Sequence, residues 1–241
     1  MYSEKHNKAV IPESSPAQVP AVGMIVLSTD FTCERDFRNV AAVHDLQFDL
    51  YVNRIHFENP MTVQSLRAML DDLASVAADI LPGYPLDAIV FNCTSASALL
   101  GDAAVRDAIQ LGKPDTPVLT TAAAGVGHIL QAGYKNISLL TPYSLEVSRG
   151  LVDYFERGGL NILSLNYMQI ADDRDVAKLT SRAIINAACA AIDADVEALF
   201  ISCTATRAAK ILPEIKQTTG LPVFSSNHSS FWQAMRILKL A

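Results

Sequence analysis

The sequence predicts an α/β protein of two similar lobes, each a four-stranded parallel sheet flanked by helices. Short apolar runs of strand length alternate with segments whose apolar residues recur at helical spacing, which is typical of βα units. In addition, one segment occurs twice: residues 87–97 read DAIVFNCTSAS, and residues 197–207 read EALFISCTATR. Cys93 and Cys203 are therefore expected to occupy equivalent positions in two duplicated halves.

The first half contains four expected strands. Residues 21–28 form a continuous apolar run, and the Thr and Asp residues that follow it suit a helix N-cap. Residues 48–55 alternate like a strand, whereas residues 65–80 place apolar side chains three and four positions apart, as on a helix. Residues 87–92 and 117–121 complete the set, with a helix expected between them.

The second half repeats this order. The two halves also share short similar segments: VLSTD resembles LLTPY, and TPVLTT resembles LPVFSS. The repeat period of about a hundred residues exceeds the roughly 20–50 residues of a solenoid unit, which favours paired lobes. The expected strands are residues 136–141, 161–166, 197–202 and 222–226, with helices around 144–158, 175–193 and 205–219.

These elements define the expected domains. Residues 1–20 carry three prolines and little periodicity, which indicates a flexible leader. The N-terminal lobe is expected over residues 21–125 and the C-terminal lobe over residues 126–227. Residues 228–241 form an amphipathic segment, which we expect to be a helix that returns to the first lobe.

Composition excludes several classes of function. The net charge of −6 and the absence of a Lys/Arg cluster argue against a nucleic-acid partner. The apolar stretches are shorter than the roughly 20 residues of a membrane helix, and the N-terminus lacks a signal-peptide segment, so a cytoplasmic location is expected. The four cysteines form no CxxC or Cys/His zinc pattern and are expected to be thiols, with no metal site.

The repeated cysteines are the candidate functional residues. Ligands of parallel sheets bind beyond the carboxyl ends of the strands, so Cys93 and Cys203 would face each other across an inter-lobe cleft. A helix N-terminus lowers a thiol pKa and offers N–H groups to a carboxylate. The hydroxyls of Thr94, Ser95 and Thr204 would extend that site. One thiolate could remove a proton α to a carboxylate and the other thiol return one, without a metal or organic cofactor.

A lone cysteine at a strand end is more often a small buried residue than a nucleophile. The duplicated Cys-Thr context favours a functional role for Cys93 and Cys203. Cys33 and Cys189 lack that context, so we interpret them as buried or incidental.

Beyond the leader, the chain resembles the aspartate/glutamate racemase superfamily, in particular its maleate cis-trans isomerase and arylmalonate decarboxylase branch. The resemblance rests on VLSTDFTCE, NCTSAS, LLTPY, SCTATR and the late SSN. It implies two Rossmann-like lobes and cofactor-independent chemistry in the cleft between them. It further implies that Cys93 is the nucleophile or base and Cys203 the acid. Thr94, Ser95, Tyr143 and Thr204 would bind the substrate carboxylate.

The presence of both cysteines bears on the reaction. Arylmalonate decarboxylases have glycine at the position that resembles Cys93, so this chain is expected to be an isomerase or racemase. Two alternatives stay open: a decarboxylase that uses Cys203 only, and a two-lobed binding or sensor module. The expected partner is a small carboxylate, and a homo-oligomer is compatible with the sequence.

One departure from the family pattern concerns specificity. Sequences that resemble maleate isomerases have V-P-S-S-N-T-T or a similar segment after the first strand, whereas this chain has Asp30 there. A second asparagine of the family corresponds to Asp172 or Asp173, and we take Asp173 as the candidate site residue. Two acids would favour a substrate with a cationic or donor group beyond its carboxylate. A helix cap by Asp30 is the other interpretation. The motifs look most like ectoine-utilisation members, whose substrates are amino- or amide-bearing acids.

Overall fold

The computed structural model describes residues 19–241. The predicted flexible leader, residues 1–20, lies almost entirely outside this range. The first sheet is parallel, with the strand order β2-β1-β3-β4. Its central strand β1 is buried along its whole length, as its apolar run predicts. The strands are β1 Ala21–Leu27, β2 Asp49–Ile55, β3 Ala88–Phe91 and β4 Val118–Thr120.

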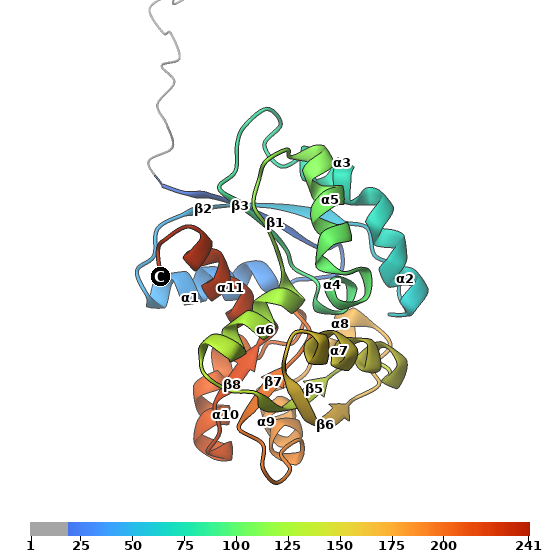
Figure 1. Ribbon diagram of the computed structural model, residues 1–241, viewed down its shortest axis with the longest axis vertical. Coiled ribbons are helices and arrows are strands. Elements are labelled where there is room, and N and C mark those ends of the chain that lie inside the picture. Colours follow the sequence, from blue (N-terminus) through green and yellow to red (C-terminus); the bar gives the residue numbers. More distant parts are fainter. Residues whose placement is uncertain (1–18) are drawn as a thin grey trace, which may run out of the picture.

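The second sheet repeats this topology. It is also parallel, and its order β6-β5-β7-β8 corresponds strand for strand to that of the first sheet. Its strands are β5 Asn136–Thr141, β6 Asn161–Tyr167, β7 Ala198–Ile201 and β8 Val223–Ser225. The predicted fold, two four-stranded parallel sheets flanked by helices, is confirmed (Figure 1).

The helices of the first lobe are shorter than the periodicity predicts. The pattern over residues 65–80 forms three pieces, and Gly101, whose φ of +83° lies outside the helical region, separates α4 from α5. These elements are α1 Cys33–Val43, α2 Val63–Ala68, η1 Met69–Asp72, α3 Leu73–Ala78, α4 Thr94–Leu100 and α5 Asp102–Gly112.

In the second lobe, two predicted helices have different bounds. The segment 175–193 is divided between two helices, and Thr180 caps the second by accepting a hydrogen bond from Ala183 N at 3.2 Å. The segment 205–219 becomes helical only from Ala209. The elements are α6 Thr121–Gln131, α7 Leu145–Arg157, α8 Asp173–Val176, α9 Ser181–Ala190, η2 Ala209–Ile211, α10 Leu212–Thr219 and α11 Ser226–Ile237. Within residues 19–241, no helix is long and apolar enough to cross a membrane.

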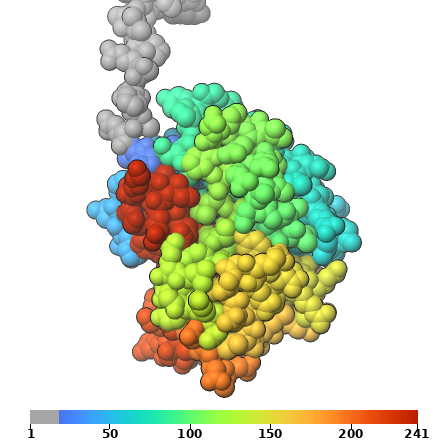
Figure 2. Space-filling model, viewed as in Figure 1, coloured from blue at the N-terminus to red at the C-terminus, as the bar shows by residue number. Residues whose placement is uncertain are grey.

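Helix α11 follows the last strand of the second lobe but packs on the first. Its fully buried Phe231 makes an edge contact with Phe37 of α1, with ring centroids 5.5 Å apart. Phe231 also belongs to an apolar cluster with Met24 of β1 and Met235 of α11. In Figure 2 the red atoms of this helix lie against the blue segments of the first lobe. The chain therefore crosses between the lobes more than once.

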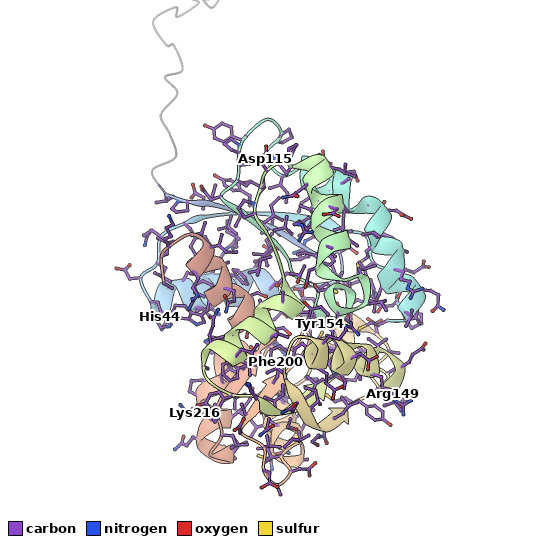
Figure 3. All side chains as sticks on the ribbon, viewed as in Figure 1. His44, Asp115, Arg149, Tyr154, Phe200 and Lys216 are labelled. Atoms are coloured by element: carbon purple, nitrogen blue, oxygen red, sulfur yellow. The ribbon has the colours of Figure 1, made fainter. Side chains whose placement is uncertain are left out.

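Helix α6 approaches the second sheet closely. A Cβ built on Gly125 would lie 2.9 Å from the ring of Phe200 on β7. Phe200 in turn makes a T-shaped contact with Phe155 of α7, with centroids 5.0 Å apart. Figure 3 labels Phe200 in this part of the second lobe. Gly125 is thus required for the contact between α6 and the sheet.

Candidate active site

The two repeated cysteines follow the carboxyl ends of the corresponding strands β3 and β7. Both are buried, with 4% of Cys93 and 6% of Cys203 exposed. Cys93 is the N-cap residue of α4 and has an extended backbone. Cys203 has a left-handed backbone with φ of +81°, and its carbonyl accepts a hydrogen bond from Thr206 N at 3.2 Å. The prediction that each cysteine opens a helix is therefore confirmed for Cys93 and wrong for Cys203.

The backbone of Cys203 explains this difference. A positive φ takes the chain out of the right-handed helical region, and for a residue with a Cβ it costs of order 1–3 kcal/mol. The chain passes through η2 before α10 begins, where Pro213 occupies the first turn and lacks the N–H that a helix interior requires. Strain of this kind is concentrated at functional sites.

Hydroxyl groups and a backbone amide surround Cys93. Its Sγ lies 3.7 Å from Ser95 Oγ, and Thr94 Oγ1 donates to Ser226 Oγ at 2.8 Å. Burial raises the pKa of the Cys93 thiol to about 12, against the opposing effects of the Ala96 amide and the Ser95 hydroxyl. The predicted lowering of the thiol pKa at this helix N-terminus is therefore wrong for the unliganded site, because desolvation outweighs the helix.

A carboxylate lies beside Cys203. Cys203 Sγ donates to Asp173 Oδ1 across 3.9 Å. Burial raises the pKa of the Cys203 thiol well above its usual value, and the charge of Asp173 raises it further. Asp173 is itself buried at the start of α8, where burial raises its pKa to about 6 even though Thr29 Oγ1 donates to its Oδ2 at 2.8 Å. The environments of the two thiols therefore differ.

Tyr143 lies next to the second cysteine. It is 1% exposed, and its hydroxyl lies 3.0 Å from the hydroxyl of Ser202, which directly precedes Cys203. Burial raises the pKa of Tyr143 well above its usual value, with Cys203 and Cys93 adding to the shift. Tyr143 is therefore a neutral donor close to both thiols.

Asp30 caps a helix. Its Oδ1 accepts hydrogen bonds from the N–H groups of Thr32 at 2.7 Å and Cys33 at 2.9 Å, and its Oδ2 accepts one from the Cys33 thiol at 2.8 Å. The capping interpretation of Asp30 is confirmed by these contacts at the start of α1. Its charge still contributes to the raised pKa values of Cys93 and Cys203. The other thiols are Cys33, buried as expected, and Cys189, which is exposed.

Thr204 is 3% exposed, and its carbonyl accepts a hydrogen bond from Asn227 Nδ2 at 2.8 Å. Thr204 therefore connects the Cys203 turn to α11. Six of the eight predicted site residues interact in the structure, through contacts or through charges that act on the two thiols: Asp30, Cys93, Ser95, Tyr143, Asp173 and Cys203. Thr94 and Thr204 directly follow the two cysteines in the chain, and their hydrogen bonds go to Ser226 and Asn227 of α11.

A family model described as arylmalonate decarboxylase matches residues 56–241. The chain belongs to this family. Maleate isomerase of Nocardia farcinica is 24% identical over 230 residues, 91% of this chain and 90% of that protein. A solved structure of the Nocardia farcinica maleate cis-trans isomerase, a mutant with a covalently bound succinylcysteine intermediate, superposes with a TM-score of 0.84 at 20% identity, covering 92% of this chain and 94% of that one. A crystal structure of arylmalonate decarboxylase gives 0.67 at 20% identity, covering 90% and 92%. These superpositions show the same fold.

Several contacts around the two cysteines of this family member were not predicted from the sequence. Thr29 binds Asp173, Asn59 Oδ1 accepts from Asp173 N at 3.1 Å, and Asn227 binds the Thr204 carbonyl. Thr29 and Asn227 belong to the VLSTD and SSN segments, which offered a signal. Asn59 lies in a loop without a motif and offered none.

A hollow that none of the predicted site residues lines lies between α1 and α10. A cavity of about 500 Å³ between α1 and α10 is lined by apolar side chains such as Val40 and Leu212, with His44 and Lys216 at its sides (Figure 3). Neither Cys93 nor Cys203 lines it. The cavity therefore does not contain the predicted chemistry.

Proposed function

We propose that the protein is a cofactor-independent isomerase of a small carboxylate, in which Cys93 is the nucleophile or base and Cys203 the proton donor. The contact between Cys203 and Asp173 is the observation that carries this proposal. A neighbouring carboxylate disfavours a thiolate, so Cys203 retains its proton. Each thiol has one backbone amide beside it, Ala96 for Cys93 and Ala205 for Cys203, but Cys93 also has the Ser95 hydroxyl, which favours its thiolate relative to that of Cys203.

On an unsaturated diacid, the two thiols would act in sequence. The Cys93 thiolate adds to one alkene carbon, the π electrons move toward the adjacent carboxylate as an enediolate, and Cys203 protonates the carbon between them. The new single bond rotates, Cys203 takes the proton back, and the Cys93–carbon bond breaks. The covalently bound succinylcysteine in the related maleate isomerase is a cysteine adduct of the saturated kind that this sequence requires.

On a substrate with an α-hydrogen, the same residues would racemise it. The Cys93 thiolate removes the proton from one face, and the Cys203 thiol delivers its own proton to the other. In both reactions the enediolate needs hydrogen-bond donors that are already in place. We assign this role to Ser95, Tyr143 and Thr204, which are buried and uncharged, and to Thr94, whose hydroxyl would turn its proton from Ser226 toward the substrate.

For the substrate, we infer an acid that carries an ammonium or amide group at its distal end. Asp173 is the stronger candidate to bind that group, because its pKa of about 6 leaves it ionised at neutral pH. Asp30 already accepts three hydrogen bonds from Thr32 and Cys33 at the start of α1 and contributes mainly through its charge. Amino- or amide-bearing acids of ectoine breakdown, the class suggested by the resemblance to ectoine-utilisation members, have this chemistry.

A decarboxylase that uses Cys203 only is the second candidate. It is favoured by the family description and by Asp173, because a thiol that is kept protonated is what a carbanion released by loss of CO₂ requires. Such an enzyme would not need Cys93. A binding or sensor module would need neither thiol.

Proton NMR in D₂O tests these alternatives. We expect the protein to convert maleate slowly, and amino- or amide-bearing acids faster, with deuterium appearing at the α-carbon or a change of double-bond geometry. Cys93→Ala and Cys203→Ala should each abolish turnover. Retained turnover in Cys93→Ala with loss of CO₂ from an arylmalonate would establish the decarboxylase, and tight binding without exchange would leave only the sensor.

A further inference from the structure

The first turn of helix α11 contains a buried amide whose hydrogen bonds reach both lobes. Asn227 is 2% exposed. Its Nδ2 donates to the Thr204 carbonyl at 2.8 Å and to Asp36 Oδ2 at 2.9 Å, and its Oδ1 accepts from Asn92 Nδ2 at 3.2 Å. Both amide N–H groups and the amide oxygen therefore have partners.

The partners of Asn227 flank the two cysteines. Thr204 directly follows Cys203, and Asn92 directly precedes Cys93. The neighbouring Ser226 accepts a hydrogen bond from Thr94, which directly follows Cys93. Two consecutive residues of α11 thus bind the chain on both sides of the first cysteine and after the second.

The network determines the orientation of the Asn227 amide. A flip would direct its oxygen at the Thr204 carbonyl and the Asp36 carboxylate, which are both acceptors. Asn92 is fixed in turn because its Oδ1 accepts a hydrogen bond from Thr121 Oγ1 at 3.0 Å. The network therefore connects α1, α6 and α11 with the ends of β3 and β7.

The Cys203 turn has particular need of this contact. Cys93 is held by α4, which begins at the next residue, whereas Cys203 is strained at φ of +81° and no helix follows it directly. The corresponding position in the first lobe cannot supply an amide, because TPVLTTA aligns Ala122 with Asn227 of LPVFSSN. The hydrogen bonds of Asn227 therefore have no counterpart at the equivalent position of the first lobe.

We propose that Asn227 is a positioning residue that holds the Cys93 and Cys203 segments in register across the two lobes. The proposal rests on the proposed function insofar as both thiols act on one substrate. Displacing reacting groups by about 1 Å can cost about 100-fold in rate. The loss of Asn227 should therefore reduce kcat far more than it raises KM.

Three variants of the full chain test this role. Asn227→Ala removes the amide, and Asn227→Asp places a carboxylate against Asp36 and the Thr204 carbonyl. Asn53→Ala is the matched control, because Asn53 Nδ2 donates to the Val76 carbonyl at 3.0 Å, between β2 and α3, away from both cysteines. For each variant, Tm and the iodoacetamide alkylation rates of Cys93 and Cys203 are measured, the latter by mass spectrometry.

We expect iodoacetamide to alkylate both Cys93 and Cys203 at least about tenfold faster in Asn227→Ala than in Asn53→Ala when the two variants lose a similar amount of Tm. A tenfold change in rate corresponds to the free energy of about one buried hydrogen bond. In Asn227→Asp the excess rate should shrink as the pH falls, because a proton shared between the new carboxylate and Asp36 restores one hydrogen bond. Equal alkylation rates and a flat pH response in Asn227 and Asn53 variants would overturn the positioning role. Thiol alkylation requires no turnover, so a wild-type protein inactive on every acid tested would reject the proposed function and leave this test intact.

Discussion

Asp173 gives the two cysteines different chemistry, because its carboxylate lies 3.9 Å from Cys203 Sγ while Ser95 and the Ala96 amide are the polar neighbours of Cys93. Their sequence contexts are nearly identical, Asn-Cys-Thr and Ser-Cys-Thr. The repeat therefore locates the pair but not the roles of its members. The roles that we propose for them depend on Asp173 of α8, which the Cys-Thr motif does not include.

The first prediction concerns the thiols. Asp173→Asn removes the charge that raises the pKa of Cys203, so Cys203 should react faster with iodoacetamide at fixed pH, while Cys93 changes less. Alkylation rates at several pH values measure both thiols. Asp172→Asn is the control, because Asp172 is bonded to Arg174 and is not among the main causes of the Cys203 shift. Equal effects of the two variants would contradict the assignment of Asp173.

At neutral pH, the substitutions Asp173→Asn and Asp172→Asn should change the free energy of unfolding in opposite directions. Burial raises the pKa of Asp173 to about 6, so its contribution to stability is complete below about pH 4, the unfolded value, and is lost as the pH rises through about 6. Asp173→Asn should therefore increase the free energy of unfolding at neutral pH by about 1–3 kcal/mol. Urea titrations at several pH values measure this.

Asp172 provides the contrast. Arg174 lowers the pKa of Asp172 to about 2, so its contribution is present above about pH 4 and is lost as the pH falls through about 2. Asp172→Asn should be less stable than the wild type at neutral pH. If Asp172→Asn and Asp173→Asn both had a larger free energy of unfolding than the wild type at neutral pH, burial of the Asp173 carboxylate would not be the reason for the gain.

At the scale of elements, strands were predicted better than helices. Continuous apolar runs such as residues 21–28 mark buried parallel strands clearly. The helix over 65–80 is interrupted by a 3₁₀ turn at Met69–Asp72, which leaves the apolar spacing nearly unchanged and so has no sequence signal. The helix predicted from residue 205 starts later because Cys203 has a positive φ. Cysteine is not a residue type that favours a positive φ, so the sequence does not indicate this conformation.

Two glycines test the packing of helices. Gly125→Ala places a Cβ 2.9 Å from the Phe200 ring and should destabilise the protein by about 1–3 kcal/mol through overpacking. Gly150, in α7, has no heavy atom within 4 Å of a built Cβ. Gly150→Ala should therefore stabilise the protein by about 0.5–1 kcal/mol. Thermal unfolding measures both, and a stabilised Gly125→Ala would mean that α6 does not contact Phe200 as described.

At the scale of the whole molecule, the lobes are joined by α6 and α11 as well as by the site itself. The duplicated halves were evident from the sequence because strand, Cys-Thr and apolar run recur in the same order. The contacts between lobes were not, since they join residues such as Asp36 and Asn227, 191 positions apart. Single-sequence patterns carry no signal at that distance.

Phe231 is the clearest test of this arrangement. Phe231→Ala should cost about 3–5 kcal/mol, because the ring is fully buried between Phe37 and Phe48. The cysteines should become more reactive at the same denaturant concentration. Ile237→Ala, at an exposed position of the same helix, should change the free energy of unfolding by less than about 0.5 kcal/mol. Similar unfolding curves for both variants would argue against docking of α11 on the first lobe.

The position of α11 also has a consequence for synthesis on the ribosome. The strands of the first sheet are synthesised early, yet the apolar face formed by Val22, Met24 and Phe37 stays uncovered until Phe231 has emerged from the ribosome. A nascent chain of this kind exposes a surface to which chaperones and other nascent chains bind. The segment that covers this face also carries Asn227, so covering the apolar face and forming the contacts of Asn227 beside Cys93 and Cys203 would occur together during folding.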